Sequence, residues 1–221
     1  MPKIKLVIFD VNETLFSFDE LEKRFKKVGL DPYYCKLWFS NVLKEGFALN
    51  SIKKFVPFRV IGENQIIKML EEKKIKKTKT NSSFILEGFK KLKAHEDVKD
   101  AFVNLKKKKI KIATLTNGHS EITKIQLKKN KLSRFVDDCF SVDDVRIWKP
   151  TKAPYLKVVE HFNFKKKDVV MVAAHSWDIA GAKDAGLLTG YVSRYEGSFL
   201  NYYEKATYSS KNLIEMSKLI I

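Results

Sequence analysis

The chain has 221 residues, which suits one core domain with an inserted or appended subdomain. No apolar run reaches about 18 residues, so the sequence predicts no transmembrane helix. The formal net charge is +17, but only 5 of the 43 basic residues are arginines, the side chain best suited to base readout and paired phosphate contacts. Scattered lysines are typical of a solvated surface, so we expect no specific nucleic-acid site. With only two cysteines and no disulfide framework, we expect a cytoplasmic protein.

Short apolar runs that end at polar residues predict five buried parallel strands. The first run, residues 4–9, ends at Asp10, and we interpret it as a strand rather than as part of a signal peptide. The other four runs are residues 110–115, 140–142, 169–173 and 190–192.

Apolar residues with a helical period occupy the segments between these strands. They lie at residues 97–107, before the second strand, and at residues 120–129, 151–162 and 177–185, after the second, third and fourth strands. Gly186 is a natural C-terminal glycine for the last of these helices. Strands that alternate with helices predict an α/β fold with a doubly wound parallel sheet. Ligands of such sheets bind beyond the carboxyl ends of the strands.

The segment of residues 16–95 interrupts this alternation, because its apolar residues follow a helical period at 18–28, 32–47, 57–74 and 84–92. Residues 73–83 are polar and lysine-rich and are typical of a linker. The sequence therefore predicts a core domain of residues 1–15 and 96–221, with a helical cap subdomain of residues 16–95 inserted between the first two strands.

Polar residues follow the ends of several predicted strands. They fall into four pieces, which are residues 10–14, 116–118, 149–150 and 173–178. Because the carboxyl ends of parallel strands meet at one edge of the sheet, we expect these pieces to share a pocket.

In this order, the four pieces resemble the motifs of the haloacid-dehalogenase superfamily. Asp10 and Thr14 fit its D-x-x-x-T motif, Thr116 the second motif, Lys149 the third and Asp178 the fourth. The resemblance covers nearly the whole chain. It is strongest to the type II 2-haloacid dehalogenases, on the residues Leu37-Trp38, Tyr155 and the run of residues 177–182.

The resemblance implies a covalent mechanism in which the carboxylate of Asp10 is the nucleophile. Lys149 would lower the pKa of Asp10 and balance its charge. Thr116 and Asn117 would donate hydrogen bonds to an anionic substrate, and Asp178 would direct the water that cleaves the ester. The predicted catalytic residues are therefore Asp10, Thr116, Lys149 and Asp178.

Two enzyme readings stay open. Phosphatases of the superfamily usually carry an acid two residues after the nucleophile and two acidic residues in the fourth motif to hold Mg²⁺. Here the first of these positions is Asn12, and the fourth motif has Asp178 but Ala174 four residues earlier. A halide leaves without an acid, so the losses favour hydrolysis of a small 2-haloacid to the 2-hydroxy acid, with no metal and no cofactor. The alternative is a Mg²⁺-dependent phosphatase of a small phosphorylated metabolite. A non-catalytic binding protein is a third reading, which the intact Asp10 and Lys149 disfavour.

The predicted substrate pocket departs from the dehalogenase pattern. Phe39 replaces an arginine that interacts with the substrate, Asn12 replaces an aromatic residue that is usually tyrosine, and Ala173 and His175 replace a serine and an asparagine. The residues expected to contact the substrate are Asn12, Phe39, Asn117, Tyr155 and His175. The predicted partner is a small anionic molecule, with no membrane partner and a possible homodimer.

Overall fold

The computed structural model describes residues 3–221 and contains a six-stranded parallel sheet in the order β3-β2-β1-β4-β5-β6. The strands are β1 (Leu6–Phe9), β2 (Lys111–Thr116), β3 (Asp138–Ser141), β4 (Val169–Ala173), β5 (Leu188–Val192) and β6 (Tyr208–Ser210). The doubly wound α/β fold is therefore confirmed. The polar edge strand β6 was not predicted, because its three residues carry no apolar run.

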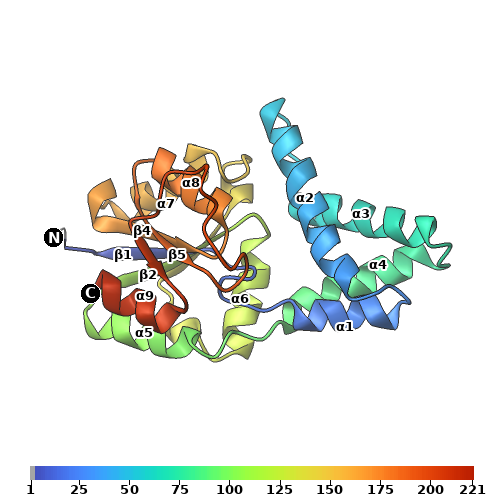
Figure 1. Ribbon diagram of the computed structural model, residues 1–221, viewed down its shortest axis with the longest axis horizontal. Helices are drawn as coiled ribbons and strands as arrows, with labels where there is room; N and C mark the ends of the chain where they lie inside the picture. The colour runs from blue at the N-terminus through green and yellow to red at the C-terminus, as the bar shows by residue number, and fades with distance from the viewer. Residues whose placement is uncertain (1–2) are drawn as a thin grey trace.

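Helices cover both faces of the sheet (Figure 1). They are α5 (Val98–Lys107), α6 (Ser120–Lys129), α7 (Lys152–Phe162), α8 (Ser176–Asp184) and α9 (Leu213–Ile220), with short 3₁₀ turns at Ser133–Phe135, Val142–Asp144 and Lys166–Asp168. Alternate residues of β1 point to opposite faces, so Val7 and Phe9 pack with α5 and α9 whereas Leu6 and Ile8 pack with α7 and α8. Gly186 closes α8 with a φ of +87°, as expected for a C-terminal glycine.

Between β1 and α5 the chain forms a helical segment that lies to one side of the sheet (Figure 1). It contains α1 (Asp19–Lys27), α2 (Tyr33–Ser51), α3 (Phe58–Glu72), α4 (Thr78–Leu86) and a 3₁₀ helix, η1 (Glu87–Lys91). Residues 16–95, all of which the structure describes, make only isolated bridges and no strand. No helix in the described part of the chain is long and apolar enough to cross a bilayer.

The prediction of a linker at residues 73–83 was wrong, because α4 begins within it at Thr78. Its threonines, asparagine and serines have modest helix propensity, but Ser82 and Ile85 are fully buried, and this tertiary packing stabilises the helix. The predicted helix at residues 84–92 is instead the last turn of α4 followed by η1.

Trp148 joins the helical segment to the loop that carries Lys149. Its ring is fully buried, and its Nε1 donates to Val56 O at 3.0 Å. Gly46 of α2 lies so close to this ring that an added Cβ would stand 2.5 Å from it. The segment therefore packs directly against the residue that precedes the predicted catalytic lysine.

Gly181 gives a first test of how α8 supports this loop. A Cβ at Gly181 would lie 2.5 Å from the Cβ of Pro150 and closer still to its carbonyl oxygen. We expect Gly181→Ala to lower the free energy of unfolding by about 1–3 kcal/mol, because the backbone of Pro150 has to move. Denaturant unfolding measures the loss. Ala180→Ser is the control, because Ala180 is half-buried on the same helix, and its free energy of unfolding should change by less than about 0.5 kcal/mol. Equal stability of both variants would contradict the packing argument.

Candidate active site

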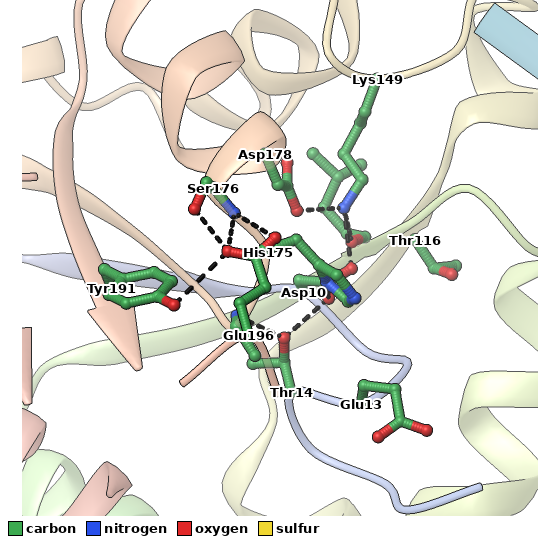
Figure 2. A network of polar contacts seen from close by, with 12 residues as sticks. Asp10, Glu13, Thr14, Thr116, Lys149, His175, Ser176, Asp178, Tyr191 and Glu196 are labelled. Carbon is green, nitrogen blue, oxygen red and sulfur yellow. Dashed lines mark hydrogen bonds and ion pairs between the residues drawn. The ribbon is translucent and has the colours of Figure 1, made fainter. Parts of the chain in front are cut away.

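The polar pieces predicted at the strand ends do meet at one edge of the sheet (Figure 2). Asp10 follows β1, and its backbone N–H donates to Val172 O of β4 at 2.9 Å. Thr116 ends β2, and Asp178 lies in the first turn of α8. Lys149 reaches the same place from the loop before α7.

Lys149 is the centre of a buried network. Its Nζ donates to Asp10 Oδ1 at 2.9 Å, to Asp178 Oδ2 at 2.7 Å and to Leu115 O at 3.0 Å, and its side chain is fully buried. An ammonium has three donors, so all of them are used. Burial disfavours the charged ammonium, but attraction to Asp10 and Asp178 outweighs burial and raises the pKa of Lys149. The cation is therefore present at neutral pH.

The carboxyl group of Asp10 is held ionised. Burial by itself would raise its pKa, but the charge of Lys149 and the contact with His175 outweigh burial and hold the pKa of Asp10 well below its usual range. Thr14 Oγ1 donates to Asp10 Oδ2 at 2.7 Å and accepts from Ala174 N at 2.9 Å. Both carboxylate oxygens are thus fixed in direction.

Asp178 and Tyr155 form the back of the network. Tyr155 OH donates to Asp178 Oδ1 at 2.5 Å, and both side chains are fully buried. Burial and the negative charge of Asp10 raise the pKa of Asp178, although Lys149 opposes them. Neither residue is among those that line the cavities at this site. The structure therefore places Tyr155 behind Asp178 rather than at the substrate position predicted from the sequence.

Thr116 and Asn117 lie next to this network. Asn117 Oδ1 accepts from Lys149 N at 3.0 Å, whereas its buried Nδ2 has no hydrogen-bond partner among the described residues. Thr116 Oγ1 accepts from Gly118 N at 2.9 Å. The N-cap of α6 is His119, whose Nδ1 accepts from the backbone N–H of Glu121 at 3.2 Å.

His175 contacts Asp10 from the end of β4. Its Nδ1 lies 3.3 Å from Asp10 Oδ2, but the geometry of a hydrogen bond is not met and neither ring nitrogen has a partner among the described residues. The ring is only 2% exposed. It packs among the aromatic rings of Phe39, Trp177 and Tyr195, with centroid separations of 6.0, 5.6 and 4.9 Å.

Glu196 fixes the start of α8 next to His175 (Figure 2). Its carboxylate accepts from Ser176 N at 3.0 Å and also from the Ser176 hydroxyl. Tyr191 OH lies 3.4 Å from the same carboxylate. Glu196 was not found from the sequence, because it stands in a loop 20 residues beyond its partner and belongs to no recognisable motif.

A small inner cavity of about 10 Å³ lies against Asp10. Its lining residues are Asp10, Asn12, Phe39, Leu43, Phe58, Asn117, His175 and Trp177. This volume is about that needed for one water molecule. An outer cavity of about 200 Å³ shares Asn12 and Phe58 with the inner one and also borders Thr116. Four predicted substrate contacts, Asn12, Phe39, Asn117 and His175, therefore do face the space next to the nucleophile.

Three residues of the inner cavity were not predicted: Leu43, Phe58 and Trp177. Leu43 and Phe58 belong to helices of the helical segment, and a helical period does not tell which turn of a helix will face the sheet edge. Trp177 is half-buried, and its ring centroid lies 5.6 Å from Lys149 Nζ. Its position next to the fourth motif was the available signal.

The residues at this site do not fit Mg²⁺. Mg²⁺ requires several oxygen ligands in octahedral geometry, but the two carboxylates present, Asp10 and Asp178, both bind the ammonium of Lys149. The positions at which a phosphatase would add carboxylates are Asn12 and Ala174. Within residues 3–221 no group of three or more His, Cys, Asp or Glu side chains could hold a metal ion.

Glu13, next to the site, gives a prediction about pH. It has a left-handed backbone with a φ of 61°, it is half-buried, and burial raises its pKa to about 7. Because this pKa lies above the ordinary value of 4.5, the protonated carboxyl group of Glu13 favours the folded state. Its contribution to stability is complete below about pH 4.5 and is lost as the pH rises through about 7. We therefore expect Glu13→Gln to raise the free energy of unfolding by about 2 kcal/mol at alkaline pH and to leave it unchanged at acidic pH.

Denaturant unfolding across this pH range checks the Glu13 prediction. Glu71→Gln, at an exposed position, is the control and should follow the wild type at every pH. If Glu13→Gln and the wild type show the same pH dependence, burial does not perturb Glu13.

Comparison with known proteins places this site in a family. The model of the family described as haloacid dehalogenase-like hydrolase matches residues 7–192. The (S)-2-haloacid dehalogenase 4A of Burkholderia cepacia is 25% identical, over 86% of this chain and 84% of that protein. Pyrophosphatase PpaX of Bacillus mycoides is 28% identical, over 86% of this chain and 84% of that protein. The structure of L-2-haloacid dehalogenase from Xanthobacter autotrophicus with chloropropionic acid covalently bound has a TM-score of 0.89 and 19% identity, and 98% of each chain is covered.

The family model covers most of the chain, and the residues that carry its four motifs meet around one buried lysine. The chain therefore belongs to the haloacid dehalogenase-like hydrolases.

Proposed function

We propose that this hydrolase converts a small 2-haloacid to the 2-hydroxy acid through a covalent ester on Asp10. The observation that carries the proposal is the position of Lys149, whose ammonium donates to the carboxylates of both Asp10 and Asp178, the two groups that a metal would need as ligands. The similarity to 2-haloacid dehalogenases supports the same assignment.

In the first half of the reaction, a carboxylate oxygen of Asp10 attacks carbon two of the substrate and halide leaves. Lys149 keeps Asp10 ionised and, with Thr14, fixes its direction. Since all three donors of Lys149 are already used, it acts on the nucleophile and does not bind the substrate carboxylate.

The donors for the substrate carboxylate are Thr116 and Asn117 in this proposal. The Nδ2 group of Asn117 is buried at the edge of the inner cavity without a hydrogen-bond partner in residues 3–221, which is costly unless a ligand accepts from it. In the second half of the reaction, water attacks the carbonyl carbon of the Asp10 ester, and the hydroxy acid leaves with an oxygen that came from Asp10.

A Mg²⁺-dependent phosphatase is the second candidate, and the similarity to a pyrophosphatase favours it. Asn12 cannot act as the acid that protonates a leaving alcohol, and Ala174 cannot bind a metal. For these reasons the dehalogenase is the better match to the site.

A parallel screen separates the two functions. The dehalogenase predicts halide release from small 2-haloacids at a rate that EDTA leaves within about twofold of the untreated rate, and no phosphate release from phosphomonoesters. Phosphate release that is lost with EDTA and restored by Mg²⁺ would make the phosphatase the function of this site.

The helical segment, residues 16–95, is the cap of the active site in this proposal, and residues 1–15 and 96–221 are the core. Leu43 and Phe58 of this segment line the cavity at Asp10, which supports that division. The cytoplasmic location and the homodimer stay predictions.

A further inference from the structure

We propose that His175 is the general base that deprotonates the hydrolytic water, an inference that rests on the proposed covalent mechanism. A general base has to reach the water directly, with about 2.6–3.2 Å between the heavy atoms. It also needs a free lone pair and a position next to the carbonyl carbon of the Asp10 ester.

Asp178 meets these requirements poorly. Its Oδ2 accepts from Lys149 and its Oδ1 accepts from Tyr155, at 2.7 and 2.5 Å. The carboxyl group is fully buried and does not line the inner cavity. These contacts make Asp178 a positioning residue that holds Lys149 against Asp10.

His175 meets all of the requirements. It lines the inner cavity, and its Nδ1 lies 3.3 Å from Asp10 Oδ2. Both ring nitrogens are buried without a partner among the described residues, and such groups are normally satisfied by a polar ligand or by water. The cavity beside them has about the volume of one water molecule.

The charge at the site changes in the required direction during the reaction. Before the first step, the imidazole of His175 lies against the ionised carboxylate of Asp10. Formation of the ester removes that negative charge and turns the same carboxyl carbon into the electrophile that water attacks. A neutral imidazole offers one nitrogen lone pair to a water proton.

The proton balance closes with groups at the site. An O–H bond of water breaks, the proton goes to a ring nitrogen of His175, and the oxygen bonds to Cγ of Asp10. The tetrahedral intermediate collapses, the ester C–O bond breaks, and the departing alkoxide takes the proton from His175. Asp10 is left as a carboxylic acid, which releases its proton to solvent through His175 and becomes the carboxylate again.

The test uses a rapid-quench experiment on His175→Asn with a 2-haloacid that the wild type turns over. Asparagine keeps a polar group but cannot accept the proton, and the type II dehalogenases that this chain resembles carry asparagine at this position. We expect a burst of one halide per enzyme at the wild-type rate, followed by ester hydrolysis about 10²–10⁴-fold slower and accumulation of the Asp10 ester in intact-mass spectra. The burst shows by itself that the variant is folded.

A second variant, His175→Ala, leaves space for imidazole supplied in solution, and we expect imidazole to accelerate hydrolysis of its ester. His175→Gln replaces His175→Asn if the latter does not fold. Ester hydrolysis at the wild-type rate in the folded variant would overturn the proposal and return the role of base to Asp178. A slower burst without accumulated ester would also overturn it, because His175 would then act in the first step. Absence of any halide release from 2-haloacids by the wild type would instead refute the proposed function.

Discussion

Asp10→Asn is expected to lower turnover by about 10⁴-fold or more, the largest effect of any substitution in this chain. The amide has almost the shape of the carboxylate, so Lys149 and Thr14 keep hydrogen-bonding neighbours, but a neutral amide is a poor nucleophile. Steady-state halide release measures the loss. Thermal unfolding should show that the variant is folded.

Asp184→Asn is the matched control for Asp10→Asn. Asp184 ends α8 with an exposed side chain that pairs only with exposed Lys152 among the described residues, at 3.1 Å. This variant should keep wild-type turnover within about twofold. An Asp10→Asn enzyme that retained more than a few per cent of turnover would show that the carboxylate of Asp10 is not the nucleophile.

Lys149→Met is expected to have the largest effect on stability. Methionine fills a similar volume, but the change leaves Asp10 and Asp178 buried without their cation. Removing one partner of a buried ion pair costs about 3–5 kcal/mol of unfolding free energy. Turnover should also fall by about 10³-fold, because the carboxylate of Asp10 loses the cation that favours its ionised form and fixes its direction.

The effect of Lys149→Met should depend on pH with a definite sign. In the wild type the pKa of Asp10 is lowered, so its contribution to stability is present above the ordinary value of 3.8 and is lost only as the pH falls through the folded-state value. In the variant the pKa of Asp10 is expected to rise above 3.8, so this carboxyl group favours the folded state at acidic pH and loses that contribution as the pH rises. The difference in stability between the two proteins should therefore widen from acidic to neutral pH.

Unfolding free energies over this pH range test the Lys149 prediction against Lys152→Met, the same substitution at an exposed position three residues away. The control should change stability by less than about 0.5 kcal/mol at any pH. A Lys149→Met protein as stable as the control would contradict the buried network described here. The double variant Lys149→Met with Asp178→Asn should regain part of the lost stability, because it removes one of the two buried carboxyl groups that lost their cation.

The convergence of the predicted catalytic residues could be expected from the sequence because a parallel sheet brings the ends of its strands together. Asp10, Thr116 and Asp178 are each recognisable next to an apolar strand, and their order along the chain matches the family motifs. Lys149 follows from the same order. These residues are specified by local sequence and topology alone.

Positions that depend on packing between elements could not be predicted. Tyr155 was expected at the substrate, but its hydroxyl donates to Asp178 instead. Phe58, the first residue of α3, lines the inner cavity, which a helical period alone does not reveal. In the fold, β6 is too short and polar to be recognised without its neighbour β5, and α4 is helical in spite of its composition.

Single-turnover hydrolysis in ¹⁸O-water with enzyme in excess tests the covalent mechanism most directly. If Asp10 forms the ester and water attacks its carbonyl carbon, the first product molecule carries unlabelled oxygen from Asp10, and the label enters the Asp10 carboxylate. Mass spectrometry of the product and of the peptide that contains Asp10 should therefore find ¹⁸O in the peptide and not in the hydroxy acid. Label in the hydroxy acid with none in the peptide would show that Asp10 acts as a general base through water, and would contradict the covalent mechanism.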